Sequence, residues 1–383
     1  MDKLQSDRIG VIINQPTDYS VFIPHKIFDK GVAIKWDPEL IRLLSEADRA
    51  LGELKGATET LPDPDLFIAF YVRKEALLSS QIEGTQCSLD EVLQVDDKTS
   101  ELKPVQEVIN YINAMNQGLE ELKNIPMSLR LVNTIHKKLL EGVRGKDKNP
   151  GEYKRKQNWI GPAGCTLNEA AYIPPPPHMM LELMGDWESY YHAQKEVPPL
   201  IEAAILHSYF ETIHPYIDGN GRVGRLLITF MLCEKKVLDK PLLYLSLFFK
   251  ENRGQYYQLL MDVRFKGLLE EWIKFFLRGV RSISEEAITT GKEIRDLHSN
   301  HRELLKEKVA QYRITFPLYD LICKNPIISI SNASKKLNSS YPTMKQAFEN
   351  FLNLHILEPY EDKKKRNKLF VYSDYLKILR RGT

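Results

Sequence analysis

The residues best suited to chemistry lie close together at positions 214–225, where the sequence reads HPYIDGNGRVGR. This segment holds an imidazole, a carboxylate and two guanidinium groups, from His214, Asp218, Arg222 and Arg225. An imidazole, with an ordinary pKa of about 6.5, can accept a proton from an attacking hydroxyl. A carboxylate can hold Mg²⁺, which typically takes carboxylate oxygens together with the phosphates of a substrate. These residue types therefore favour phosphoryl chemistry.

The glycines and arginines of the same segment favour an anion. Gly219 and Gly221 let the backbone approach a ligand closely, and exposed N–H groups at a helix start attract negative charge. Arg222 and Arg225 are three residues apart, so they lie near each other in the first turn of the helix expected to follow. Cations in that turn oppose the helix dipole unless an anion joins them. We therefore expect a phosphate-bearing ligand at this helix start.

The glycines also match the dinucleotide-binding pattern G-x-G-x-x-G, because Gly224 completes the series. That pattern requires a buried strand in front of it, within a βαβ unit. Residues 199–213 instead have helical periodicity, and no parallel-sheet pattern occurs nearby. The sequence also lacks a Walker A segment and the kinase motif set. These three interpretations are therefore rejected.

Residues 214–225 resemble the signature of the Fic family, H-P-F-x-[DN]-G-N-G-R-x-x-R, and depart from its specified positions only by Tyr216 in place of Phe. The resemblance implies a protein adenylyltransferase that moves AMP from Mg·ATP to a Ser, Thr or Tyr hydroxyl of a target protein. It implies that His214 is the general base and that Asp218 is the ligand of Mg²⁺ or Mn²⁺. Removal of AMP, or transfer of another phosphate-containing group, remains open, because relatives use the same site for these reactions.

The same resemblance implies the contacts to ATP. Gly219, Asn220 and Gly221 would cradle the α- and β-phosphates, Arg222 would contact the β-phosphate, and Arg225 would hold the γ-phosphate.

Residues 252–264, NRGQYYQLLMDVR, resemble the family stretch that lines the adenine pocket, which would be Tyr256 and Leu260. Two adjacent aromatic residues on a helix are also typical of a core, so both interpretations stay open. Arg264 stands where some relatives carry Asn, so base recognition departs from the family pattern at that position.

Residues 75–86, EALLSSQIEGTQ, resemble the inhibitory motif of the family, [ST]-x-x-x-E-[GN], with Ser79, Glu83 and Gly84 at the specified positions. A carboxylate in the last turn of a helix faces the negative end of the dipole, which costs about 0.3–1 kcal/mol unless a cation compensates. Arg225 is the expected cation. A Glu83–Arg225 pair would withhold the guanidinium from the γ-phosphate, so the motif predicts an autoinhibited enzyme. A merely solvated Glu83 is the alternative.

Residues 157–173 contain two short β-like runs around a Gly/Pro/Asn loop and predict a hairpin, which the prolines at 174–177 must end. This segment resembles the flap of the family, which offers a strand edge to a segment of the target protein. We therefore expect the target to bind at residues 157–173, with an ordinary surface hairpin as the alternative.

Helices are expected to position these segments, after an extended arm over residues 1–36. The predicted helices begin at Asp37 and at the Pro198-Pro199 pair, and cover residues 66–83, 104–122, 127–140, 178–193, 226–235 and 255–309. The expected fold is mainly α, a Fic-type helical core with a small β-hairpin flap and a C-terminal winged helix-turn-helix. The expected domains are an N-terminal arm and helical region with the inhibitory helix (1–125), a catalytic domain (126–300) and the winged helix-turn-helix (301–383).

The last eighty-odd residues differ from the rest in charge. Residues 301–383 hold 16 Lys/Arg against 8 Asp/Glu, whereas the whole chain has a net charge of +2. Residues 340–350, with Lys345 and Gln346, would form a recognition helix, and the basic run 363–366 would form the wing. A DNA partner, a protein partner and a homodimer all remain open. The rival function is a DNA-binding regulator that senses nucleotide.

The composition is that of a soluble globular protein, with 43% hydrophobic residues in a chain of 383. No stretch approaches the roughly 18 uninterrupted apolar residues of a membrane span. The four cysteines form no C-x-x-C pair, which argues against a disulfide framework and a structural zinc site. We therefore expect a cytoplasmic protein without a membrane partner.

Overall fold

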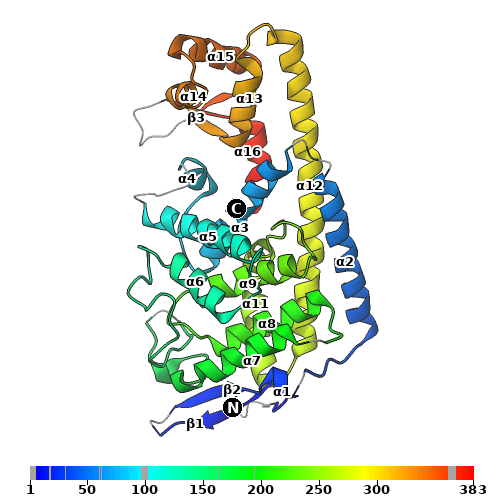
Figure 1. The fold of residues 1–383 in the computed structure, drawn as a ribbon, viewed down its shortest axis with the longest axis vertical. Coiled ribbons are helices and arrows are strands. Elements are labelled where there is room, and N and C mark those ends of the chain that lie inside the picture. The colour runs from blue at the N-terminus through cyan, green and yellow to red at the C-terminus, as the bar shows by residue number, and fades with distance from the viewer. Residues whose placement is uncertain are drawn as a thin grey trace.

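The structure is a computed structural model that describes residues 6–16, 19–30, 32–59, 61, 63–95, 102–162, 164–193, 195–360 and 368–383. Figure 1 shows an elongated molecule in which α12 (Leu269–Val309) runs along much of the long axis. The remaining helices form a large body, and the C-terminal elements form a smaller unit at one end. The body contains the candidate chemistry, and α12 joins it to the C-terminal unit.

Helices dominate the described structure, which confirms the prediction of a mainly α chain. The body contains α1 (Ile27–Lys30), α2 (Pro38–Glu59), α3 (Pro64–Ile82), α4 (Leu89–Leu93), α5 (Lys103–Glu121), α6 (Leu129–Leu139), α7 (Met180–His192), α8 (Pro199–Ile213), α9 (Asn220–Glu234), α10 (Ser246–Glu251) and α11 (Arg253–Lys266). The C-terminal unit contains α13 (Thr315–Lys324), α14 (Ile330–Lys336), α15 (Tyr341–Asn353) and α16 (Ser373–Leu379). The short helices α1, α4, α10 and α16 have no counterpart among the predicted ones. Gly267, in a left-handed conformation (φ 67°), separates α11 from α12.

The helix α3 lies at the centre of the body. Asp63 caps its N-terminus by accepting a hydrogen bond from the Leu66 N–H (3.0 Å), and Pro64 is its first residue. Gly84 follows its C-terminus in a left-handed conformation (φ 88°), which glycine adopts without steric cost. Residues 74–80 are buried without interruption. This part of the helix is therefore covered on all sides.

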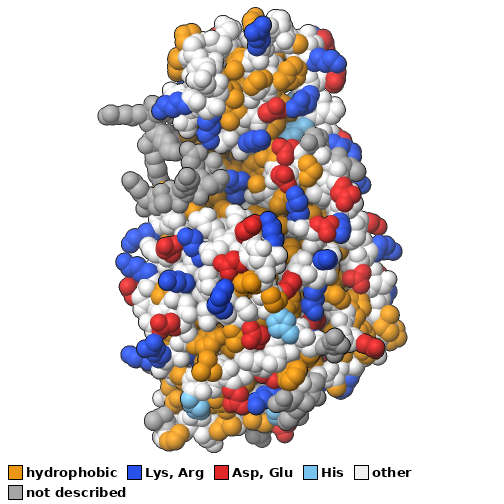
Figure 2. All heavy atoms as spheres, in the orientation of Figure 1, with side chains coloured by type: hydrophobic (Ala, Val, Ile, Leu, Met, Phe, Trp, Pro, Cys, Tyr) orange, Lys and Arg blue, Asp and Glu red, His pale blue; other side chains and the backbone are white. Residues whose placement is uncertain are grey.

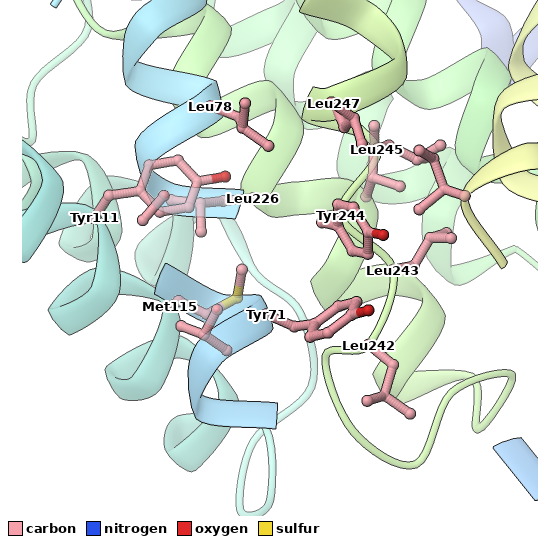
Figure 3. Close-up of a cluster of buried hydrophobic side chains, with 14 of the residues drawn as sticks. Tyr71, Leu78, Tyr111, Met115, Leu226, Leu242, Leu243, Tyr244, Leu245 and Leu247 are labelled. Atoms are coloured by element: carbon pink, nitrogen blue, oxygen red, sulfur yellow. The ribbon is translucent and has the colours of Figure 1, made fainter. Parts of the chain in front are cut away.

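Several elements supply the core around α3. Figure 3 shows the buried side chains that meet there: Tyr71 and Leu78 of α3, Tyr111 and Met115 of α5, Leu226 of α9, and Leu242, Leu243, Tyr244, Leu245 and Leu247. The rings of Tyr71 and Tyr244 pack edge to face, with 4.6 Å between their centroids. This packing fixes the helix that carries the predicted inhibitory motif.

The N-terminal arm forms a hairpin in which β1 (Gly10–Asn14) pairs antiparallel with β2 (Ser20–Pro24). The Phe22 N–H donates to the Ile173 carbonyl (3.0 Å), so β2 lies beside the segment 157–173, which we call the flap. The Phe22 ring also packs edge to face against Phe265 of α11 (5.8 Å). The arm therefore supports the flap from one side.

The flap has less strand structure than the predicted hairpin. In its described residues, one pair, Ile160 and Tyr172, exchanges two backbone hydrogen bonds of 2.8 and 3.0 Å. A short 3₁₀ helix, Leu167–Glu169, lies between them. Pro162 and Pro174 have no N–H to donate, so the ladder cannot extend in either direction. The proline content explains the difference.

The C-terminal unit contains a three-stranded antiparallel sheet in the order β3-β5-β4, from β3 (Ile327–Ser329), β4 (Glu358–Tyr360) and β5 (Leu369–Val371). Its elements follow the order α13, β3, α14, α15, β4, β5 and α16, and α15 contains the residues of the predicted recognition helix. The predicted wing, residues 363–366, lies outside the described residues. The helix α12 passes through residue 300 without a break, so the change in charge there does not coincide with a loop.

The surface shows no separation of charge on the face in Figure 2, where Lys and Arg are interspersed with Asp and Glu. Across the described ranges, no helix has both the length and the apolar character needed to span a membrane. All four cysteines are free thiols, and Cys87 and Cys323 are buried.

Candidate functional site

The candidate site lies at the loop between α8 and α9. His214 ends α8 in a left-handed conformation (φ 49°), and its N–H donates to the Phe210 carbonyl (2.9 Å). A non-glycine residue rarely adopts this conformation, and such residues cluster at functional sites. Gly219 also has a positive φ (86°) and comes just before α9. Two left-handed residues thus form the sharp connection between the helices.

The backbone of His214 is held by one residue from just before the flap and one from its start. Lys154 Nζ (3.0 Å) and Asn158 Nδ2 (3.1 Å) both donate to the His214 carbonyl. Burial lowers the pKa of Lys154 to about 7. Burial, with the nearby charges of Lys154 and Arg264, lowers the pKa of His214 to about 3. The imidazole is therefore neutral at physiological pH, which is the form that can accept a proton.

Asn220 stabilises the loop itself. Its Oδ1 accepts from the Tyr216 N–H (2.9 Å), and its Nδ2 donates to the Tyr216 carbonyl (2.8 Å). Asn158 Nδ2 also donates to that carbonyl (2.7 Å). The Asn220 side chain is buried and engaged, so only its backbone N–H, at the start of α9, is placed for the predicted phosphate cradle.

His136 on α6 holds the loop from the opposite side, and the sequence analysis missed it. Its Nδ1 accepts from the Gly151 N–H (2.8 Å), so its Nε2 carries the proton and donates to the Asp218 carbonyl (2.9 Å). Its ring stacks on Tyr216 with 3.7 Å between centroids. Burial lowers the pKa of His136 to about 4, which keeps this tautomer neutral. No sequence signal connects a helix eighty residues upstream with the loop.

The two predicted guanidiniums are almost completely buried. Arg222 is 0% exposed and donates from Nη2 to Asp218 Oδ1 (3.3 Å), and its Nη1 lies 3.8 Å from Glu107 Oε2. Among the described residues, Nε and Nη1 of Arg222 and Nη1 of Arg225 have no hydrogen-bond partner. Buried donors without partners are unfavourable, so these atoms are available to an anion. The side chain of Asp218 is 32% exposed.

The residues of the predicted inhibitory motif contact Arg225. Its Nη2 donates to Glu83 Oε1 (2.8 Å), and its Nε donates to Ser79 Oγ (2.8 Å). Burial would raise the pKa of Glu83, but the charge and hydrogen bond of Arg225 outweigh burial and hold that pKa below its usual range. The Glu83 carboxylate is therefore ionised and paired.

Gly221 leaves room for this carboxylate. A Cβ at position 221 would lie 2.3 Å from Glu83 Oε1 and 3.1 Å from Arg225 Nη1. The carboxylate therefore lies directly against the N-terminal turn of α9, where the sequence predicts an anion.

Tyr256 and Leu260 lie in the core in this structure. Tyr256 is 1% exposed, its OH bonds with His207 Nε2 (2.9 Å), and its ring stacks on Phe249 (4.6 Å). The neighbouring Tyr257 is 39% exposed. The structure thus favours the packing interpretation for Tyr256, which the sequence analysis left open.

Arg264 links three elements and is not free for base recognition. Its Nη2 donates to the Glu211 carbonyl (2.9 Å), and its guanidinium lies 4.0 Å from the centroid of the Tyr172 ring in the flap. Glu211, which the sequence analysis also missed, is a buried carboxylate on α8 with Oε2 3.7 Å from His214 Nδ1. Burial raises the pKa of Glu211 to about 7, against the opposing charge of Arg225.

Comparison with known families gives two matches. Residues 126–232, which include the α8–α9 loop, match the Fic/DOC family. Residues 41–120, which include Ser79 and Glu83, match the N-terminal domain of the Fic/DOC family.

Curated relatives are named protein adenylyltransferases. A probable protein adenylyltransferase of Aquifex aeolicus is 27% identical over 179 residues, which cover 45% of this chain and 51% of that protein. The protein adenylyltransferase Fic of Culex quinquefasciatus is 28% identical over 200 residues, covering 50% of this chain and 35% of that protein. The chain thus spans about half of the first relative and about a third of the second.

A solved structure shares the fold across most of the chain. The crystal structure of a Fic family protein from Desulfovibrio desulfuricans G20 superposes with a TM-score of 0.59 and 21% identity, over 89% of this chain and 97% of that one. This similarity extends well beyond the residues 41–232 that the family matches span.

The role of Asn220 as the stabiliser of the loop predicts a loss of stability. Replacing Asn220 by Ala removes both hydrogen bonds to the Tyr216 backbone. The buried N–H of Tyr216 then lacks Asn220 Oδ1 as its acceptor. We expect the free energy of unfolding, measured by urea denaturation, to fall by about 1–3 kcal/mol. Gln258→Ala, which removes an exposed amide bonded to Asp262, should change it by less than about 0.5 kcal/mol. Equal changes in the two variants would contradict this role.

Proposed function

The chain belongs to the Fic/DOC family, and we propose that it transfers AMP from Mg·ATP to a Ser, Thr or Tyr hydroxyl of a target protein. The observation that carries the proposal is the set of buried guanidinium nitrogens of Arg222 and Arg225 without a hydrogen-bond partner, in the first two turns of the helix that follows the neutral His214. The names of the relatives support the same reaction.

In the proposed reaction, the hydroxyl oxygen of the target attacks the α-phosphorus of ATP while the bond from that phosphorus to the pyrophosphate oxygen breaks. His214 accepts the proton of the hydroxyl, which its neutral state permits. Lys154 and Asn158 hold the left-handed backbone of His214 and so fix where the imidazole lies, at the end of α8. The products are the AMP-modified protein and pyrophosphate.

The residues present fit a triphosphate and a divalent ion. The N–H groups of Gly219, Asn220 and Gly221 at the start of α9, with Arg222 and Arg225, would bind the phosphates. Asp218 would hold Mg²⁺ or Mn²⁺, since its side chain is partly exposed next to these cations. When bound, the metal ion neutralises phosphate charge and orients the groups that react.

The flap provides an edge for the target. Because Ile160 and Tyr172 form a hydrogen-bonded antiparallel pair, the backbone groups of Trp159 and Gly161 point to the opposite edge. The other edge of the flap is already occupied, because the Ile173 carbonyl accepts a hydrogen bond from the Phe22 N–H. An extended target segment would therefore pair with residues 159–161 by β-augmentation and bring its hydroxyl towards His214.

The contact between Glu83 and Arg225 supports an autoinhibited resting state. A γ-phosphate needs Arg225 Nη2 and the space against Gly221, and the Glu83 carboxylate occupies both. ATP would then bind with its γ-phosphate misplaced. The predicted alternative, a Glu83 that is only solvated, does not match this contact.

The C-terminal unit is proposed as a separate binding module of the winged helix-turn-helix type, with a protein or DNA as its partner. Lys345 and Gln346 on α15 are exposed, as a recognition helix requires. We also propose a cytoplasmic location and domain boundaries near residues 125 and 300, the second of which falls inside α12, the helix that joins the body to the C-terminal unit.

The reaction is tested by mass spectrometry of the chain after incubation with Mg·ATP, where automodification adds the mass of one AMP group. We expect His214→Ala to lower the transfer rate by roughly 10²–10⁴-fold while ATP binding persists. His178→Ala, a histidine outside the loop, serves as the control and should retain the rate. Normal transfer by His214→Ala would remove His214 as the base.

The metal requirement is tested with Asp218. Activity should need Mg²⁺ or Mn²⁺ and disappear in EDTA, and Asp218→Ala should lose it at every metal concentration. Asp239→Ala, which removes an exposed carboxylate paired with Lys55, should leave the metal dependence unchanged. Full activity in EDTA would rule out the metal assignment.

The inhibitory contact is tested with a mutation that should raise activity. Glu83→Gly frees Arg225 for the γ-phosphate, so automodification at saturating Mg·ATP should become faster. A complete shift from 1:99 to 99:1 would need about 5.5 kcal/mol, of which one charged pair supplies a part. Glu120→Gly, at the exposed end of α5, should have no such effect.

Two further variants separate inhibition from catalysis. Glu83→Gly combined with His214→Ala should be inactive, because relief of inhibition does not replace the base. Arg225→Ala should lose inhibition without gaining activity, because the phosphate ligand is lost too. A Glu83→Gly protein no faster than the wild type would refute the inhibitory role and leave the AMP-transfer proposal standing.

A further inference from the structure

The end of the chain packs against the helix that carries Ser79 and Glu83. Figure 1 shows the C-terminus lying beside α3, near the middle of the molecule. The ring of Tyr375 on α16 packs edge to face against Phe70 of α3, with 5.5 Å between centroids. The side chain of Leu93 on α4 packs against an apolar cluster of the C-terminal unit formed by Ile327, Leu369, Val371 and Leu376.

A charged contact joins the same two regions just after the inhibitory motif. Asp90 on α4 lies seven residues beyond Glu83. Its Oδ1 accepts from Arg380 Nε (2.9 Å), and its Oδ2 accepts from Arg380 Nη2 and from the Tyr360 OH (2.9 Å). The side chain of Asp90 is only 16% exposed. A carboxylate with three donors in a bidentate arrangement is a geometrically specific contact.

The last residues also contact an element that holds α3 directly. A Cβ at Gly382 would lie 2.6 Å from Leu247 Cδ1, so the chain end lies tightly against α10. Ser246, the first residue of α10, donates from its N–H to the buried Glu75 Oε2 of α3 (3.1 Å). Lys250 on the same helix donates to Gln81 Oε1 (2.7 Å), two residues before Glu83. The C-terminal end thus contacts α4 and α10, two elements next to the last turn of α3, residues 79–84, which we call the inhibitory turn.

We propose that β4, β5, α16 and Arg380, which we call the C-terminal clamp, hold the inhibitory turn of α3 against Arg225. The clamp fixes α4 through Asp90, and α4 begins only five residues after Gly84, so it limits how far Glu83 can move. A partner that separates the clamp from α4 would therefore shift the balance towards a free Arg225. This inference rests on the proposed AMP transfer and its inhibition by Glu83.

The test compares Asp90→Ala and Arg380→Ala in the full chain, with and without Glu83→Gly. In the wild-type background each should raise automodification by about two- to fivefold, the size expected for loss of a partly exposed ion pair. In the Glu83→Gly background neither should have an effect, because no inhibitory contact remains to be released. The charge-exchanged double variant Asp90→Arg/Arg380→Asp should return towards the wild-type rate.

A second measurement does not depend on activity. Hydrogen exchange of the amides of Glu83, Gly84 and Thr85, which donate to carbonyls of the last turn of α3, should become faster in Asp90→Ala and Arg380→Ala. Lys377→Ala, on the exposed side of α16 and paired with Asp374, is the matched control and should change neither rate nor exchange.

The outcomes separate the two proposals. If Glu83→Gly activates but Asp90→Ala and Arg380→Ala change neither rate nor exchange, the clamp is overturned and the inhibitory contact stands. If both variants act equally with and without Glu83, the clamp is also overturned, because its effect does not pass through Glu83. If no variant, Glu83→Gly included, transfers AMP, the proposed function fails first.

Discussion

Two guanidiniums buried at the start of one helix set the main constraint on this structure. Arg222 and Arg225 are 0% and 2% exposed, and they lie in the turn where the dipole of α9 is already positive. Burying such charges without partners costs several kcal/mol each. The surrounding carboxylates of Glu83, Glu107 and Asp218 offset part of that cost. The site therefore requires anions, supplied either by the protein or by a ligand.

This requirement explains how one cation can serve two states. Glu83 gives Arg225 a partner when no phosphate is present, and a γ-phosphate would give it one during catalysis. In the proposed function the two anions would compete for Arg225 and for the space against Gly221, which the Glu83 carboxylate occupies in this structure. The proposed inhibition would then need no separate binding site, because the substrate would have to displace the carboxylate that pairs with Arg225 in this structure.

The sequence predicts well what lies within short segments. The longer helices, whose spacing and end signals are local, lie near their predicted positions, although α9 begins at Asn220 and not at residue 226, and the short helices α1, α4, α10 and α16 were not predicted. Contacts from distant segments could not be predicted: His136, Lys154 and Asn158 hold the loop from elements far away in the chain, and their sequence context carries no sign of it. The strand content of the flap was overestimated. Its alternating residues suggest strands, but Pro162 and Pro174 prevent a longer ladder. Tyr256 matches the sequence pattern of an adenine pocket, but it is buried in the core of this structure. Its burial depends on packing against distant segments, which the sequence does not show.

The position of α3 limits how inhibition can be relieved. Its buried apolar side chains include Phe67, Phe70, Tyr71, Leu77, Leu78 and Ile82. Exposing each costs about 1.5–3 kcal/mol, so removing the whole helix would cost roughly 10 kcal/mol or more, comparable with the total stability of a domain. Release from the proposed inhibition would therefore be confined to residues 79–84 and the short segment that joins them to α4. The position of α4 in turn depends on Asp90 and on contacts with the C-terminal unit. Because the rest of α3 belongs to the core, its C-terminal end is the part on which the proposed regulation would act.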